Sequence, residues 1–263
     1  MKRAIGLIVM AAFLFCGIVA GAMFYRQYSD AKSSGDTFSE LQELVKQPEE
    51  TSDPTETDET TGDTTEDVEV PQEPIIFDKY RLLYEQNNDL VGWIRIDGTG
   101  IDYPVMQMPS NPDYYLKHSF EKTWSDYGVP YVDESCTVGA SNNLVIYGHN
   151  MKNGSMFSGL VQYKSKEFFE SHPVICFDTV DEPGQYQVIA AFRYNTNNET
   201  FKYNKHSDMD EFEFAEYVEN CKLRSLYDTG ITAEYGDMLI TLSTCEYTYT
   251  NGRFVVVAKK IVE

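Results

Sequence analysis

Three side chains with complementary chemistry stand at the ends of predicted strands in this sequence. The run Thr-Leu-Ser-Thr-Cys at 241–245 ends on Cys245, and Arg253 follows eight residues later. Far upstream, His149 ends the apolar run Asn-Leu-Val-Ile-Tyr-Gly at 143–148. A thiol can attack an amide carbonyl, an imidazole can protonate the leaving amine, and a guanidinium can hold the oxyanion. The three residues therefore predict nucleophilic cysteine chemistry.

The pattern around Cys245 explains how Arg253 could lie beside it. Alternate residues of a strand share a face, which puts Ser243 and Cys245 on one side. Residues 246–252 end in Asn-Gly, a turn-forming pair, so the chain is expected to return as a hairpin. A neighbouring positive charge stabilises the thiolate, which is the reactive form. The competing interpretation is a buried strand cysteine with an unrelated surface arginine.

His149 opens a polar loop, Asn-Met-Lys-Asn-Gly at 150–154, from which it could turn into a cleft and act as a general acid. A solvated loop histidine is the alternative. The order of the residues argues against a papain-like enzyme, in which cysteine precedes histidine, and the G-x-S-x-G elbow is absent. Neither H-E-x-x-H nor paired metal-ligand spacing occurs, so no metal or organic cofactor is indicated.

The N-terminus predicts how the chain is placed in the cell. Residues 4–25 form an uncharged apolar stretch after Lys2 and Arg3. A helix of roughly 20 residues crosses a hydrocarbon core, and the basic flank favours a cytoplasmic N-terminus. We therefore predict that residues 1–30 form an uncleaved transmembrane anchor, with the lipid bilayer around residues 4–25 and the remainder extracellular. A cleaved signal peptide with Ala-Gly-Ala at 20–22 is the alternative.

The charge is unevenly distributed. Residues 48–74 hold eleven carboxylates and no Lys or Arg, and so supply −11 of the net charge of −21. Such a segment cannot bury enough apolar surface to fold, which predicts an extended spacer, although an acidic recognition tail is the alternative. Before it, Thr-Phe-Ser-Glu at 37–40 indicates a capping box that opens a short juxtamembrane helix within 31–74. Nucleic-acid binding is disfavoured because no basic stripe appears.

The folded domain is predicted to occupy residues 75–263 and to be mainly β. Short β-like runs are separated by Gly, Pro, Asn and Asp, and few helices are inserted, which favours a barrel or sandwich over βαβ units. The five cysteines have no close pairs, which is unlike a small disulfide-rich fold or a zinc ribbon. The predicted helices cover 154–163, 165–171 and 208–222. The predicted strands cover 91–96, 101–106, 129–133, 143–148, 173–179, 185–194, 237–244 and 253–261.

Several of these runs together resemble the sortase family, and within it class B. The resemblance spans residues 76–261 and includes a helix at 208–222 similar to the extra helix of class B members. It implies an eight-stranded β-barrel with inserted and N-terminal helices, whereas the acidic spacer is not a family feature. The runs that carry it are Asp-Leu-Val-Gly-Trp-Ile at 89–94, Asp-Tyr-Pro-Val at 102–105, Tyr-Gly-His-Asn-Met at 147–151, Thr-Leu-Ser-Thr-Cys at 241–245 and Gly-Arg-Phe-Val-Val at 252–256.

The resemblance also implies a membrane-bound cysteine transpeptidase. Cys245 would attack a Thr carbonyl in the C-terminal sorting signal of a secreted protein, His149 would protonate the leaving segment, and Arg253 would hold the oxyanion. An amine of a peptidoglycan precursor would then resolve the thioester. The region around Asn111 and Tyr115 resembles the part of the family that lines the signal groove.

The groove residues, the type of function and the substrates stay open at the level of sequence. Ser243 is a plausible groove contact, but it could instead be an ordinary strand residue, as could Asn111 and Tyr115 in their turn. An extracytoplasmic cysteine protease that hydrolyses its acyl-enzyme would carry the same catalytic residues. A catalytically silent surface-binding protein is the third interpretation. The sorting signal and the acceptor amine are not specified.

Overall fold

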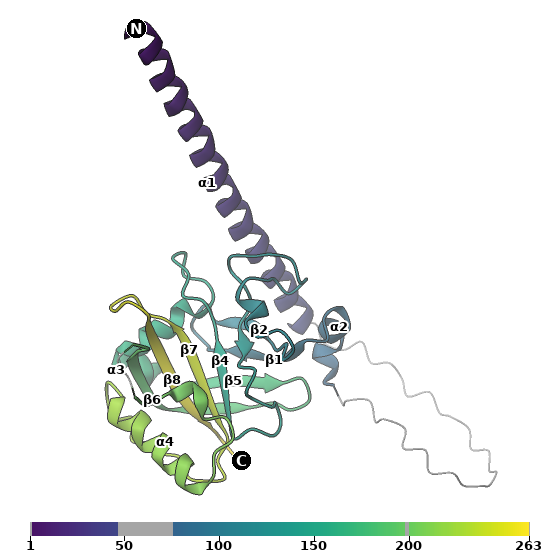
Figure 1. Ribbon diagram of the computed structural model, residues 1–263. Coiled ribbons are helices and arrows are strands. Elements are labelled where there is room, and N and C mark those ends of the chain that lie inside the picture. The colour runs from purple at the N-terminus through teal and green to yellow at the C-terminus, as the bar shows by residue number, and fades with distance from the viewer. Residues whose placement is uncertain (1, 47–75, 198–199, 263) are drawn as a thin grey trace, which may run out of the picture.

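The computed structural model describes residues 2–46, 76–197 and 200–262, and within them eight strands close into a barrel (Figure 1). The strand order is β1-β2-β3-β4-β7-β8-β6-β5, and β5 pairs with β1 to complete the ring. Each of the eight predicted strands is present. Their bounds are β1 Leu90–Arg95, β2 Asp102–Met106, β3 Tyr131–Val132, β4 Asn143–Tyr147, β5 Val174–Thr179, β6 Gln185–Asn195, β7 Leu239–Cys245 and β8 Gly252–Lys260.

The helices lie outside the barrel wall. The predicted helix at 208–222 is confirmed as α4, whose first turn is capped by Asp210 and Glu213 in a capping box. The segment predicted at 154–163 is a 3-10 helix, η2. The bounds are α1 Lys2–Lys46, α2 Asp78–Gln86, η1 Tyr114–Leu116, η2 Phe157–Lys164, α3 Lys166–Ser171, η3 Tyr203–Lys205 and α4 Glu211–Arg224.

Two strand pairings bring distant parts of the chain to one rim of the barrel. β7 and β8 form an antiparallel hairpin, in register from Leu239 opposite Lys259 to Cys245 opposite Arg253. β4 runs parallel to β7, with Tyr147 beside Ser243. Parallel strands end at the same edge, so the chain leaves β4 where β7 also ends. The site is built at this rim.

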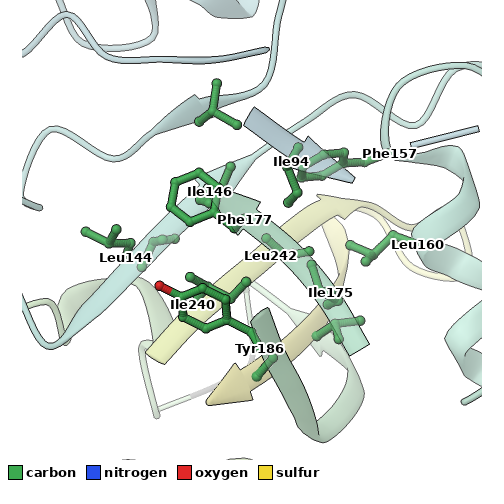
Figure 2. Close-up of a cluster of buried hydrophobic side chains, with 14 of the residues drawn as sticks. Ile94, Leu144, Ile146, Phe157, Leu160, Ile175, Phe177, Tyr186, Ile240 and Leu242 are labelled. Atoms are coloured by element: carbon green, nitrogen blue, oxygen red, sulfur yellow. The ribbon is translucent and has the colours of Figure 1, made fainter. Parts of the chain in front are cut away.

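Apolar side chains fill the barrel interior. Figure 2 shows Ile94, Ile146, Phe177 and Leu242 packed together from different strands, and each is at most 1% exposed. These strands are rich in β-branched and aromatic residues, which suit a pleated wall, and β7 and β8 are buried on both faces along most of their length. The interior is therefore a packed core, and ligands are confined to the rim and the outer surface.

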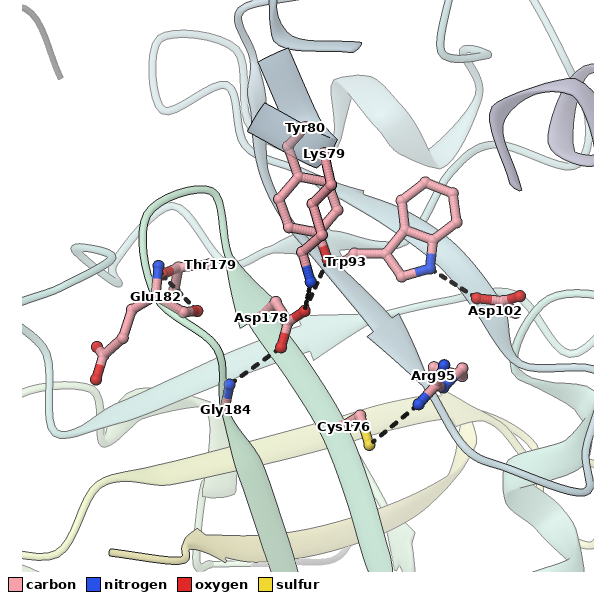
Figure 3. Close-up of polar contacts among 10 residues, drawn as sticks. All are labelled: Lys79, Tyr80, Trp93, Arg95, Asp102, Cys176, Asp178, Thr179, Glu182 and Gly184. Atoms are coloured by element: carbon pink, nitrogen blue, oxygen red, sulfur yellow. Dashed lines mark hydrogen bonds and ion pairs between the residues drawn. The ribbon is translucent and has the colours of Figure 1, made fainter. Parts of the chain in front are cut away.

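Polar contacts fix α2 on the outer wall. Lys79 Nζ and Tyr80 OH both donate to one carboxylate oxygen of Asp178 on β5, at 2.6 and 2.8 Å (Figure 3). Next to them, Trp93 Nε1 donates to Asp102 Oδ1 at 2.7 Å and so ties β1 to β2. The two bonds to Asp178 hold α2 against the barrel.

α1 differs from the sequence-based expectation. It is one uninterrupted helix of 45 residues, so the prediction of a separate short helix opened by a capping box at 37–40 was wrong. Phe38 and Leu41 are buried, and Phe38 packs edge-on against the Tyr103 ring at 5.0 Å between centroids. Gln42 Nε2 donates to the carbonyl oxygen of Asp102 at 2.7 Å. This packing on β2 stabilises the helix through the place where local sequence predicts a start.

Within the part of the chain that the structure describes, no helix combines the length and apolar character needed to cross a membrane. The predicted acidic spacer at 48–74 lies outside the described residues.

Candidate active site

Cys245 and Arg253 face each other next to the turn of the β7–β8 hairpin. Cys245 is the last residue of β7, Arg253 is the second of β8, and the register pairs them directly. Both are half-buried. The guanidinium Nη1 donates to the carbonyl oxygen of Gly252 at 3.1 Å, which holds it near the start of its own strand. The hairpin thus places a thiol and a guanidinium side by side.

His149 comes to the same rim through the parallel β4–β7 pair. It lies two residues beyond Tyr147, and Cys245 lies two residues beyond the paired Ser243. The Thr244 hydroxyl donates to the carbonyl oxygen of Gly148 at 2.7 Å, and the Gly148 N–H donates to Ser243 O at 3.1 Å. These bonds extend the strand pairing up to the two reactive side chains.

Residue 148 must be a glycine because the backbone there packs directly against the Phe157 ring. A Cβ there would lie 2.5 Å from the Phe157 ring, which is fully buried. Beyond it, Asn150 Nδ2 donates to the carbonyl oxygen of Cys245 at 2.9 Å. The sequence pattern alone does not indicate this role for Asn150, although Asn150 belongs to the Tyr-Gly-His-Asn-Met run. The histidine loop is therefore bonded to the cysteine backbone itself.

The imidazole of His149 is oriented by a backbone carbonyl. Its Nε2 lies 2.8 Å from the oxygen of Leu116, which can only accept, so Nε2 carries the proton and donates. The pKa of His149 lies below its usual value, mainly because burial disfavours the charged ring and also because Lys117 is near, while the Leu116 carbonyl acts in the opposite direction. The neutral ring is favoured, and Nδ1 is the nitrogen that can accept or donate a proton in a reaction.

The three side chains line one cleft of about 730 Å³. Ser243 lines it too, and its hydroxyl is hydrogen-bonded to Tyr203 OH at 2.7 Å. Burial raises the pKa of Tyr203 to about 12, against the effects of the Ser243 bond and of the Arg253 charge. The walls carry both signs of charge, with Asp113, Asp133 and Glu134 as well as Lys202 and Lys205.

The two other predicted groove residues lie elsewhere. Tyr115 is 1% exposed, and its hydroxyl donates to Asp89 Oδ2 at 2.7 Å and accepts from Asn87 Nδ2 at 2.9 Å. Its side chain is thus part of the interior and supports the loop whose next residue, Leu116, lines the cleft. Asn111 is exposed in a turn and is not among the described residues that line the cleft.

Comparison with known proteins assigns the chain to a family. The family model for the sortase domain matches residues 94–261. Sortase B of Listeria monocytogenes is 33% identical over 189 residues, covering 71% of this chain and 75% of the relative. The chain belongs to the sortase family, in its class B. Sortase B of Staphylococcus aureus is 32% identical over 186 residues, covering 70% of this chain and 75% of the relative.

Solved sortase structures share the whole barrel. Sortase B from Bacillus anthracis in complex with AAEK1 has a TM-score of 0.71 at 28% identity, covering 90% of this chain and 100% of that one. A Staphylococcus aureus sortase B–substrate complex has a TM-score of 0.64 at 30% identity, covering 71% and 86%. Sortases are cysteine transpeptidases, so the fold and the class of enzyme expected from the sequence are confirmed.

Proposed function

We propose that this sortase cleaves the C-terminal sorting signal of secreted proteins and transfers the acyl group to an amine of a peptidoglycan precursor. The observation that carries the proposal is the meeting of Cys245, His149 and Arg253 in one cleft, although they come from three separate strand ends. A relative of the same class has been solved with a substrate bound, which supports the use of this fold for peptide recognition.

In the first half-reaction, the Cys245 thiolate attacks the backbone carbonyl of a Thr in the sorting signal. The guanidinium of Arg253 donates to the oxyanion that forms. His149, protonated at Nδ1, gives that proton to the leaving amine as the carbon–nitrogen bond breaks. The products are a thioester on Cys245 and a released C-terminal segment.

In the second half-reaction, the acceptor amine attacks the thioester. The neutral imidazole of His149 takes a proton from the attacking nitrogen, and the sulfur leaves as the new amide bond forms. We propose that Ser243 contacts the bound signal, since its side chain lines the cleft. For Asn111 a substrate contact stays a prediction, and Tyr115 is better explained as support for the Leu116 loop.

We propose that residues 1–30 anchor the enzyme in the cell membrane in a single pass, with residues 75–263 as an extracellular catalytic domain. The uncharged stretch at 4–25 and the basic residues before it support this. Membrane fractionation of the full chain and of a chain lacking residues 1–30 tests it. Recovery of the full chain in the soluble fraction would argue against the anchor.

The catalytic proposal is tested with the purified protein and a library of sorting-signal peptides. Cys245→Ala and His149→Ala are expected to lose cleavage while their melting temperatures stay near that of the wild type. Mass analysis with and without an added amine separates transfer from hydrolysis, which is the competing function. If Cys245→Ala cleaved the peptides at the wild-type rate, the proposed mechanism would be wrong.

A further inference from the structure

Glu246, the residue after Cys245, carries a buried carboxylate that the mechanism does not use. It is 4% exposed. Its Oε1 accepts from Lys164 Nζ and from the Thr248 hydroxyl, both at 2.5 Å, and its Oε2 accepts from the Thr248 N–H at 2.9 Å. Arg193 Nε lies 4.0 Å away. Burial acts to raise the pKa of Glu246, but the bonds from Lys164 and Thr248 outweigh it and keep the carboxylate ionised.

This ion pair joins the two segments that lead to the catalytic residues. Lys164 is the last residue of η2, which follows the His149 loop. Glu246 begins the loop between Cys245 and Arg253, and its N–H donates to the carbonyl oxygen of Gly252 at 3.0 Å to close that loop. The Glu246 side chain therefore fixes the turn that sets how Cys245 faces Arg253.

Glu246 lies away from the substrate. Side chains alternate along an extended chain, so that of Glu246 is directed to the face opposite Cys245. Neither Glu246 nor Lys164 is among the described residues that line the cleft. The carboxylate would thus affect a bound peptide only indirectly, through the position of the Cys245 backbone.

We propose that the Lys164–Glu246 ion pair is a positioning element that holds Cys245 and Arg253 in their reactive arrangement. The inference rests on the proposed roles of those two residues. Loss of the ion pair leaves Lys164 or Glu246 without its partner and loosens the turn between Cys245 and Arg253. We therefore expect a lower rate of the chemical step, with little change in the affinity for the peptide.

The kinetic test uses the full chain with Lys164→Met, Glu246→Gln and the double variant. Each single variant is expected to lower kcat about tenfold with KM changed less than about twofold, and the double variant to be no worse than the more damaging single one. Lys164→Arg, which keeps the charge, is expected to restore kcat.

The matched control is Lys259→Met, which removes the ion pair between Lys259 and Asp237 at the other end of the same hairpin, where Nζ and Oδ2 are 3.2 Å apart. It is expected to leave kcat and KM unchanged.

A second measurement does not depend on substrate. Amide hydrogen exchange of residues 246–252 by NMR is expected to become at least about tenfold faster in Lys164→Met and Glu246→Gln, and not in Lys259→Met. Glu246→Gln has nearly the wild-type shape and carries the test should Lys164→Met fail to fold. Unchanged exchange in a folded variant, or a loss that falls wholly in KM, would overturn the proposal. Faster exchange in these variants, found together with a wild-type protein that cleaves no sorting-signal peptide, would support the positioning role and refute the proposed function.

Discussion

Arg253 lies across the β7–β8 pair from Cys245 and already donates one bond, to the carbonyl oxygen of Gly252. A guanidinium has five N–H donors in a rigid fork, so it can keep this bond and still donate to an oxyanion. A lysine ammonium carries the same charge without the fork. Orientation as well as charge should therefore matter at this position.

Arg253→Ala is expected to lower kcat/KM by roughly 100- to 1,000-fold, since it removes the proposed oxyanion donor. Arg253→Lys should retain part of the lost rate. Peptide cleavage kinetics measure both, and thermal melting checks that each variant is folded. A rate for Arg253→Ala within a few-fold of the wild type would assign the oxyanion to another donor.

The lowered pKa of His149 has a consequence for stability. As the pH falls below about 6.5, the ordinary pKa of histidine, the unfolded chain binds a proton at this residue before the folded chain does. The stability that the neutral His149 ring contributes above that pH is therefore lost as the pH falls through the pKa of His149 in the folded protein. His149→Gln is expected to show a smaller drop in melting temperature between about pH 7.5 and pH 5.5. An equal drop in both proteins would contradict the burial of the ring.

Sequence pointed to the candidate catalytic side chains better than to the groups that arrange them. Cys245, His149 and Arg253 stand out by their types and by the turn at 246–252. The carbonyl of Leu116 could not be predicted, since every residue has one. Tyr115 looked suited to a groove, but tertiary packing decided that its ring is in the interior and its hydroxyl bonded to Asp89.

Among the elements, the β7–β8 turn leaves no room for a side chain at residue 252. A Cβ on Gly252 would meet the carbonyl oxygen of Glu246 at 2.3 Å, and that oxygen belongs to backbone that cannot move aside cheaply. The turn closes only because residue 252 has no side chain. The register of Cys245 with Arg253 depends on it.

Gly252→Ala is expected to lower kcat/KM at least about tenfold and to destabilise the fold by about 1–3 kcal/mol, a typical cost of overpacking. Gly100→Ala is a matched control, since a Cβ there meets nothing closer than 3.9 Å. Kinetics and denaturant unfolding measure both effects. Equal behaviour of the two variants would show that the turn can relax.

Strand positions could be predicted from alternation and from turn residues, and all eight were found. Their partners could not, because periodicity does not state which strand lies beside which. The parallel pairing of β4 with β7 is what brings His149 to Cys245. The capping pattern at 37–40 failed for a related reason, as contacts of Phe38 with the barrel outweigh a local helix start.

At the scale of the whole molecule, α1 is part of the folded body as well as an N-terminal extension (Figure 1). Phe38→Ala is expected to destabilise the protein by about 3 kcal/mol, since it empties a buried aromatic site. Leu223→Ala, at a side chain 75% exposed, should change stability by less than about 0.5 kcal/mol. Denaturant unfolding of the two variants tests whether α1 stays on the barrel in solution.

The docking of both helices on one barrel changes what the acidic segment can do. Lys46 ends α1 and Asp78 begins α2, and each helix is bonded to the barrel close to these ends. Both ends of the intervening sequence are therefore attached to the same body. Under the proposed anchoring, the standoff between catalytic cleft and lipid is set by α1, at about 1.5 Å per helical residue. Lengthening the segment between Lys46 and Asp78 is therefore expected to leave that standoff unaltered.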